Sequence, residues 1–221
     1  MRLQKINKTL KEFDHFTGGP NDKFAEVALA TFYSLAVLGL TPAKTLLDIG
    51  CGALRNGFLL MNYLDAGNYY GVEPNTGMLD EGKAKLAAPF LDAKTPHFSH
   101  TDQFDFAGSF PDTRFDFALA RSIFTHASKA QIDLCISELA RVSHPGTIFL
   151  LSFLPPKTPD DPEYDGDAWL GRSHLSDTPG IAHYRKKTLI DMARPHGFEP
   201  LPGAEKIVLQ AVQEWLVLRH A

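Results

Sequence analysis

The sequence predicts a single α/β domain, residues 1–221, in which helices cover both faces of a doubly wound, mostly parallel sheet. Three observations predict this fold. Short apolar segments alternate with segments of helical periodicity along most of the chain. A glycine turn, Gly50-Cys51-Gly52, follows the first apolar segment, and the second apolar segment ends at an acidic residue, Glu73. Both features are typical of the ligand-binding edge of a parallel sheet.

The first elements are a helix and a strand. A helix is predicted to run to about residue 38. Residues 21–23 can cap its N-terminus, and residues 39–42 end it. Together with its flanks it would form an N-terminal helical cap, residues 1–44, ahead of the strand 45–49. The helix is apolar on nearly every side. We favour a buried helix, and the alternative is a subunit interface, which would make the protein a homodimer.

The alternation continues through the middle of the chain. The predicted strands are the apolar segments 69–72, 95–100, 115–120 and 147–153. The predicted helices between them are 55–64, 78–88 and 129–142. Residues 143–146, Ser-His-Pro-Gly, are expected to form the turn before the fifth strand. Right-handed crossovers then place a ligand at the carboxyl ends of the strands.

Regular periodicity ends after residue 153. Residues 154–183 combine five prolines with several aspartates and are expected to form a long acidic loop on the substrate side of the domain. A helix, 186–196, follows and ends at Gly197. The last two predicted strands are 207–210 and 214–218.

Composition limits the class of protein. Forty-four per cent hydrophobic and 22% charged residues are typical of a globular domain. The net charge of −4 gives no overall reason to bind nucleic acid, so a small-molecule substrate is expected. The two cysteines, Cys51 and Cys135, suit a reducing cytoplasm. The most apolar segment, 24–40, is shorter than the roughly 20 residues of a bilayer span, so no membrane contact is expected.

The glycine turn and Glu73 together predict a nucleoside-binding site. Glycines have no side chain, so a ligand can lie directly against the backbone of the turn. A carboxylate at the end of the second strand can accept hydrogen bonds from two ribose hydroxyls.

With these residues in place, the sequence resembles the class I S-adenosylmethionine-dependent methyltransferases over most of its length. Residues 48–52, Asp-Ile-Gly-Cys-Gly, resemble the first motif of that family, and Glu73 resembles the acidic residue that ends its second strand. Residues 115–126 resemble its fourth-strand motif, and residues 139–146 the segment before its fifth strand. The resemblance implies S-adenosylmethionine as cofactor. It also implies a Rossmann-like sheet of seven strands, with the last strand antiparallel between the fifth and sixth.

Two alternatives stay open at the sequence level. An NAD-dependent oxidoreductase also uses a glycine turn, but here Arg55 stands at the third glycine of G-x-G-x-x-G. Asp48 would also repel a pyrophosphate, whereas it can serve a cationic methionine group. A non-catalytic S-adenosylmethionine-binding regulator is the other alternative, since a fold does not establish an activity.

Ten residues are candidates for cofactor binding, on the strand ends and the loops after them. They are Asp48, Gly50, Cys51, Gly52, Glu73, Pro74, Asp102, Gln103, Arg121 and Ser122. By resemblance, Asp102 and Gln103 would flank the adenine, and Arg121 and Ser122 would lie near the methionine group. His126 is the candidate catalytic base, because a histidine can take a proton near neutral pH.

Substrate contacts are expected from His174, His183 and Tyr184, in or just after the acidic loop. No set of His, Asp or Glu has convincing metal-site spacing, so metal-independent chemistry is expected. The expected reaction is an in-line displacement of the sulfonium methyl. The end of strand four lacks the Asn/Asp-Pro-Pro-Tyr pattern that the family uses for planar amines, so an oxygen acceptor on a small molecule is favoured.

Overall fold

The computed structural model describes residues 23–171, 176–209 and 213–221. Its strands are β1 (Leu46–Ile49), β2 (Tyr69–Val72), β3 (His97–Ser99), β4 (Phe115–Ala120), β5 (Ser143–Phe153), β6 (Phe198–Pro200) and β7 (Glu214–His220). They form one seven-stranded sheet in the order β3-β2-β1-β4-β5-β7-β6. β1 to β5 are parallel, and β7 is antiparallel to both β5 and β6. The predicted fold class and the placement of the last strand are therefore confirmed.

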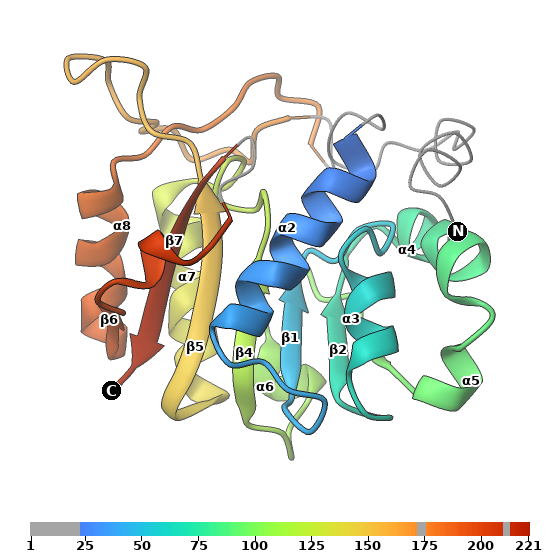
Figure 1. Ribbon diagram of the computed structural model, residues 1–221. Helices are drawn as coiled ribbons and strands as arrows, with labels where there is room; N and C mark the ends of the chain where they lie inside the picture. Colours follow the sequence, from blue (N-terminus) through green and yellow to red (C-terminus); the bar gives the residue numbers. More distant parts are fainter. Residues whose placement is uncertain (1–22, 172–175, 210–212) are drawn as a thin grey trace.

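Helices cover both faces of this sheet (Figure 1). The α-helices are α2 (Phe24–Val37), α3 (Gly57–Tyr63), α4 (Thr76–Gly82), α5 (Leu91–Lys94), α6 (Phe106–Ser109), α7 (Lys129–Arg141) and α8 (Lys186–Ala193). A π-helical segment, η2 (Lys83–Ala87), continues α4, and two 3-10 turns are η3 (Arg194–His196) and η4 (Ala204–Lys206). In Figure 1, α2 and α3 lie on the near face, and α6 and α7 lie behind β4 and β5.

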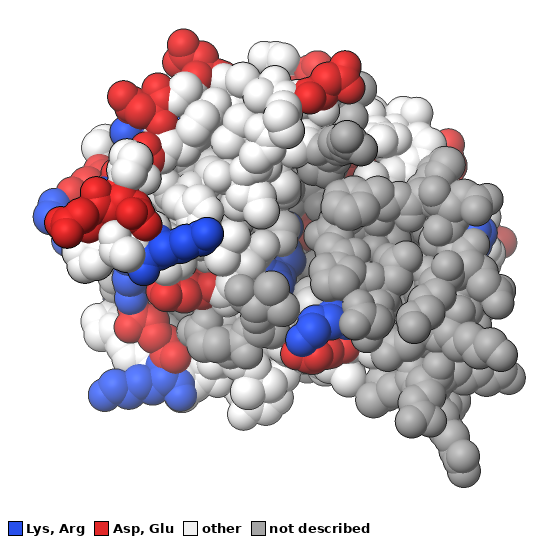
Figure 2. All heavy atoms as spheres, turned by 90° about the horizontal axis from the view of Figure 1, so that it is seen from above, with Lys and Arg blue, Asp and Glu red and all other residues white. Residues whose placement is uncertain are grey.

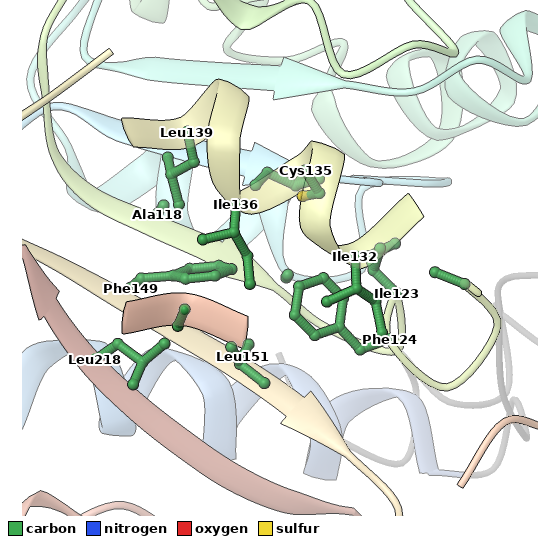
Figure 3. Close-up of a cluster of buried hydrophobic side chains, with 14 of the residues drawn as sticks. Ala118, Ile123, Phe124, Ile132, Cys135, Ile136, Leu139, Phe149, Leu151 and Leu218 are labelled. Carbon is green, nitrogen blue, oxygen red and sulfur yellow. The ribbon is translucent and has the colours of Figure 1, made fainter. Parts of the chain in front are cut away.

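The core consists of two apolar layers, one on each side of the sheet, because neighbouring strand residues point to opposite faces. On β5, Phe149 and Leu151 pack in the layer that contains α7, whereas Leu150 packs in the layer that contains α2. The buried residues of α7 recur at helical spacing: Ile132, Cys135, Ile136 and Leu139. Figure 3 shows these side chains over the sheet. Two-sided burial explains why the strands are apolar at successive positions.

The turn predicted at residues 143–146 is wrong, because β5 already begins at Ser143. Ser143 pairs with Phe115, and the register shifts between Phe115 and Phe117. The irregularity accommodates Gly146, whose φ of 98° is left-handed, and the Thr147 hydroxyl donates to the Phe115 carbonyl at 2.6 Å. A strand with a bulge therefore replaces the expected turn.

The strand predicted at residues 207–210 is also wrong. Ile207, Val208 and Leu209 follow η4, and the Leu209 N–H donates to the Ser34 hydroxyl of α2 at 3.0 Å rather than to a strand. The sixth strand is the earlier segment Phe198–Pro200. Three consecutive apolar residues resemble a strand in sequence even when they only cover a helix. Gln210 lies outside the described residues.

The α2 helix is only partly buried. It starts at Phe24, and Lys23 at its N-terminus makes no capping hydrogen bond with its side chain. Residues 1–22 of the expected helical cap, which include the other two expected capping residues, lie outside the described part of the chain. Leu29, Tyr33 and Val37 are 42%, 46% and 37% exposed and lie one turn apart. The favoured interpretation, a fully buried helix, therefore needs correction, because one apolar stripe faces outward.

Gly82 allows α4 to pack directly on the glycine turn. A Cβ at Gly82 would lie 2.5 Å from the backbone carbonyl of Ala53, which cannot move aside as a side-chain end could. Gly82→Ala is expected to lower the free energy of unfolding by about 1–3 kcal/mol in urea titrations, as overpacking does. Gly77→Ala, in the same helix, is the matched control. Its Cβ meets only the Asn75 side chain at 3.6 Å, so no loss is expected, and equal losses for both variants would contradict this account.

Candidate functional site

A cavity of about 230 Å³ opens at the edge of the sheet where β1, β2 and β4 end. One part of its lining comes from the glycine turn and the end of β2: Ile49, Gly50, Val72 and Pro74. The loop after β3 adds residues 101–104. The rest comes from the loop after β4, from α7 and from the long loop after β5: Ile123, Gln131, Trp169 and Ser176. The cavity is therefore where the sequence places the ligand.

The glycine turn presents bare backbone to this cavity. Gly50 and Gly52 have φ values of 67° and 54°, a conformation that suits glycine. The N–H groups of Gly50 and Cys51 both donate to the Val72 carbonyl, at 2.8 and 3.0 Å, which ties the turn to β2. A Cβ at Gly50 would lie 2.1 Å from Cδ1 of Ile123. Any larger residue would therefore press on the loop after β4.

Glu73 connects the turn to the start of α4. Its side chain is fully buried, and its two carboxylate oxygens accept from the N–H groups of Gly52 at 2.9 Å and Asn75 at 2.8 Å. Glu73 is not among the residues that line the cavity, and these two hydrogen bonds fix its carboxylate between the glycine turn and the start of α4. The Asn75 side chain in turn caps α4 by accepting from the Met78 N–H at 3.0 Å.

Asp48 and Cys51 lie in a buried polar group and do not line the cavity. The Asp48 carboxylate is 1% exposed and accepts from the Tyr69 hydroxyl at 2.7 Å. Burial raises the pKa of Asp48 to about 7; the Tyr69 hydrogen bond opposes this rise and the charge of Glu73 adds to it. Gly57 makes room for Tyr69, since a Cβ there would lie 2.5 Å from the hydroxyl. Sequence reasoning missed this partner of Asp48, because Tyr69 is also an ordinary strand residue.

A polar network ties together the ends of β4, β5 and β7. Ser122 has a φ of 61°, which is rare outside glycine. Its N–H donates to the Ser152 hydroxyl at 2.8 Å, and its hydroxyl accepts from the Gln213 amide at 2.8 Å. Arg121 donates to the Gln213 side-chain oxygen at 2.5 Å and stacks over the Trp215 ring. The network holds the strained residue in place. No sequence pattern pointed to Ser152 or Gln213.

Two guanidinium groups approach each other at the ends of β1 and β4. Burial lowers the pKa of Arg55 to about 10, and burial together with the positive charge of Arg55 lowers the pKa of Arg121 to about 10. Both side chains remain charged at neutral pH. Arg55 also lies over the Phe24 ring, 5.6 Å from its centre. This edge of the sheet therefore carries positive charge beside the glycine turn.

The acidic loop after β5 has a negatively charged outer surface. Figure 2 looks down on this edge of the molecule and shows acidic side chains gathered on one side. The loop there carries exposed Asp160, Asp165 and Asp167, of which Asp165 pairs with Lys129 at 2.8 Å.

Backbone hydrogen bonds fix the inner part of this loop on the segment after β4. Leu170 N–H donates to the His126 carbonyl at 2.8 Å, and Ala182 N–H donates to the Thr125 carbonyl at 2.8 Å. The His126 ring contributes as well, because its Nδ1 is 2.8 Å from the Leu170 carbonyl. A carbonyl only accepts, so Nδ1 carries the proton. These bonds place Trp169 and Ser176 on the cavity.

The predicted site residues fall into three groups. Gly50, Pro74, Asp102 and Gln103 line the cavity. His126 anchors the loop and does not line the cavity, so its catalytic role stays a prediction. His183 is tied to the Pro155 carbonyl at 2.9 Å. Tyr184 is fully buried, and its hydroxyl donates to the Ala127 carbonyl at 2.8 Å. We therefore do not propose it as a substrate contact. His174 lies outside the described residues.

The described residues hold neither a metal-binding cluster nor a membrane-spanning helix. Nowhere in that part of the chain do three or more His, Cys, Asp or Glu side chains gather closely enough to hold a metal ion. No helix in the described ranges is both long and apolar enough to cross a bilayer. Metal-independent chemistry stays a prediction.

Fold and site together define a class of protein. The sheet order with its antiparallel β7 is that of class I methyltransferases. The cavity is lined by bare glycine backbone at Gly50 and by apolar Ile49, Val72 and Ile123, and the buried carboxylate of Glu73 follows Val72 without lining the cavity itself. The chain offers no third glycine for a pyrophosphate, since Arg55 stands there.

Comparisons with known proteins agree. Residues 46–146 match the model of a family described as a methyltransferase domain. This match and the fold make the chain similar to the class I S-adenosylmethionine-dependent methyltransferases.

Solved structures share the fold across nearly the whole chain. Magnesium protoporphyrin IX methyltransferase (ChlM) from Synechocystis PCC 6803, with bound S-adenosylmethionine, has 16% identity and a TM-score of 0.62, over 90% of this chain and 83% of that chain. CcbJ methyltransferase from Streptomyces caelestis has 19% identity and a TM-score of 0.64, over 98% and 96%. The sugar N-methyltransferase KedS8 from Streptoalloteichus sp ATCC 53650 has 18% identity and a TM-score of 0.62, over 94% and 95%.

Proposed function

We propose that this protein is an S-adenosylmethionine-dependent methyltransferase that methylates an oxygen atom of a small molecule by in-line displacement. The observation that carries the proposal is the cavity between bare glycine backbone at Gly50 and the loop that supplies Trp169. Its lining comes partly from the strand ends at Ile49, Gly50 and Val72 and partly from α7 and the loop after β5. When bound, S-adenosylmethionine would supply a methyl group on a positively charged sulfur: the acceptor oxygen would bond to the methyl carbon as the methyl–sulfur bond breaks, and S-adenosylhomocysteine would leave with the electron pair of that bond.

The residues of the chain bind and orient the reactants in this proposal. Gly50 and Gly52 admit the nucleoside, and Glu73 accepts from the ribose hydroxyls. Pro74, Asp102 and Gln103 surround the adenine. Asp48, Cys51, Arg121 and Ser122 shape the methionine end from the ends of β1 and β4. Alignment of the nucleophile with the methyl group and exclusion of water would supply most of the rate enhancement.

A base is needed only for an acceptor that must lose a proton. We keep His126 as the candidate. Its Nδ1–H is committed to the Leu170 carbonyl, so the neutral ring would take a proton at Nε2. His183 is retained as a candidate substrate contact at the edge of the acidic loop.

A panel of acceptors tests the function. We expect methyl transfer from methyl-labelled S-adenosylmethionine to phenols or carboxylic acids, with amino sugars and aromatic amines as the nitrogen arm. An oxygen acceptor is favoured because the end of β4 lacks the Asn/Asp-Pro-Pro-Tyr pattern. The names of KedS8 and of the glycopeptide N-methyltransferase MtfA, in contrast, describe methylation of nitrogen. Transfer only to amines would overturn the oxygen assignment. Binding of the cofactor without turnover of any acceptor would identify a regulator instead of an enzyme.

We also propose a cytoplasmic homodimer that does not bind nucleic acid. The exposed stripe of Leu29, Tyr33 and Val37 on α2 supports the dimer, with exposed Leu209 near Ser34 beside it. Light scattering is expected to give twice the monomer mass for the native protein. Leu29→Lys combined with Tyr33→Lys is expected to give the monomer mass. A monomeric native protein would rule out the dimer.

A further inference from the structure

Gln131 lines the cavity from the first turn of α7 and is held in one orientation. Its side-chain oxygen accepts from the Ser128 N–H at 2.9 Å, and its own N–H donates to the Ser128 hydroxyl at 3.3 Å. Both bonds together form a capping box. Because a backbone N–H only donates, the atom that faces Ser128 must be the amide oxygen. The orientation of the amide is therefore determined chemically.

The other end of that amide is an unused donor. Within the described ranges, Nε2 of Gln131 makes no hydrogen bond, and the side chain is half-buried. A glutamate could form the same capping box, so the cap alone does not call for an N–H group. Once a ligand displaces water from the cavity, a donor without an acceptor costs free energy. A ligand with an oxygen at this place would satisfy it.

Trp169, from the loop after β5, also lines the cavity and gives it a flat apolar surface. Its ring stacks on the His126 ring, with centres 6.1 Å apart and an interplanar angle of 22°. Two hydrogen bonds hold that arrangement: the Leu170 N–H donates to the His126 carbonyl, and the His126 ring Nδ1–H donates to the Leu170 carbonyl. Ser176, which also lines the cavity, donates to the Trp169 carbonyl at 2.6 Å. A planar ligand can therefore lie against a fixed indole.

We propose that Gln131 determines acceptor specificity, by donating from Nε2 to a carbonyl or hydroxyl oxygen of a planar methyl acceptor that lies against Trp169. The inference rests on the proposed function and names the class of its substrate. Pro74, Asp102 and Gln103 serve the adenine from the other part of the lining, so the wall of Gln131 and Trp169 receives the acceptor.

The test uses two probes of nearly the same shape, acetophenone and α-methylstyrene, which differ in a carbonyl oxygen against a methylene group. Dissociation constants are measured by NMR titration of protein saturated with S-adenosylhomocysteine. Gln131→Glu keeps the capping oxygen but replaces the donor, so its melting temperature is expected to stay within about 2 °C. The ratio of the two constants is expected to shift against acetophenone by about tenfold in this variant, with little change for α-methylstyrene. Gln131→Leu, which also loses the cap, is expected to show the same shift with a lower melting temperature.

Three results would overturn the inference. They are an unchanged ratio in Gln131→Glu, no binding of acetophenone to the native protein, and a loss of more than about fivefold in S-adenosylhomocysteine affinity, which would place Gln131 at the cofactor. Failure of the native protein to bind S-adenosylhomocysteine at all would instead be a failure of the proposed function. The two failures are thus distinguishable.

Discussion

Glu73→Ala is expected to weaken the binding of S-adenosylhomocysteine by about 1.5–3 kcal/mol, roughly 10- to 150-fold, in a calorimetric titration. The variant loses the carboxylate proposed for the ribose hydroxyls. It also frees the N–H groups of Gly52 and Asn75, which hold the glycine turn against α4. Both effects weaken the binding of S-adenosylhomocysteine. The loss of affinity should therefore be larger than that caused by substituting any single residue that lines the cavity.

Glu81→Ala is the matched control for this prediction. Glu81 is a nearby glutamate in α4, and its carboxylate pairs with Lys85, four residues further along the chain in η2. Its removal is expected to leave the affinity for S-adenosylhomocysteine unchanged within about twofold. Native affinity in Glu73→Ala would contradict the ribose assignment.

The buried Asp48 is expected to make the protein less stable as the pH rises from about 4 to about 7. The folded state holds the Asp48 proton with a pKa of about 7, against an ordinary value of 3.8. In that window the folded state binds more protons than the unfolded state, so the free energy of unfolding falls with pH. Each pH unit is worth about 1.4 kcal/mol, which makes the full window worth roughly 4 kcal/mol.

Asp48→Asn isolates this contribution, because an amide oxygen can still accept from the Tyr69 hydroxyl but cannot titrate. The variant is expected to match the native protein near pH 4 and to exceed its stability by several kcal/mol at pH 8, in urea titrations at each pH. Taking the difference between the two proteins cancels the groups that they share. A difference that stays constant with pH would show that Asp48 titrates normally.

Local sequence signals predicted the fold well where burial is two-sided. Strands β2 and β4 were predicted with their observed bounds, because continuous apolar runs between turn residues have few other interpretations. The predicted turn at Ser143 and the predicted strand at Ile207 are wrong because contacts between distant segments determine the structure there. Ser143 enters the sheet through a bulge, and the segment after Ile207 covers α2.

The candidate site divides in the same way. Gly50 and Glu73 were recognisable because a local motif carries them, a turn directly after a strand. Gln131, Trp169 and Ser152 were not, because each joins the site through contacts between segments far apart in the sequence. Gln131 had one usable signal, the S-x-x-Q pattern of a capping box starting at Ser128, but that pattern predicts a helix start and no ligand.

A crystal structure of the protein soaked with S-adenosylhomocysteine tests the central claim most directly. We expect the ligand against the glycine turn, with both ribose hydroxyls within hydrogen-bonding distance of the Glu73 carboxylate and the adenine beside Pro74. A cavity that stays empty at saturating ligand, or that accepts NAD in its place, would contradict the account.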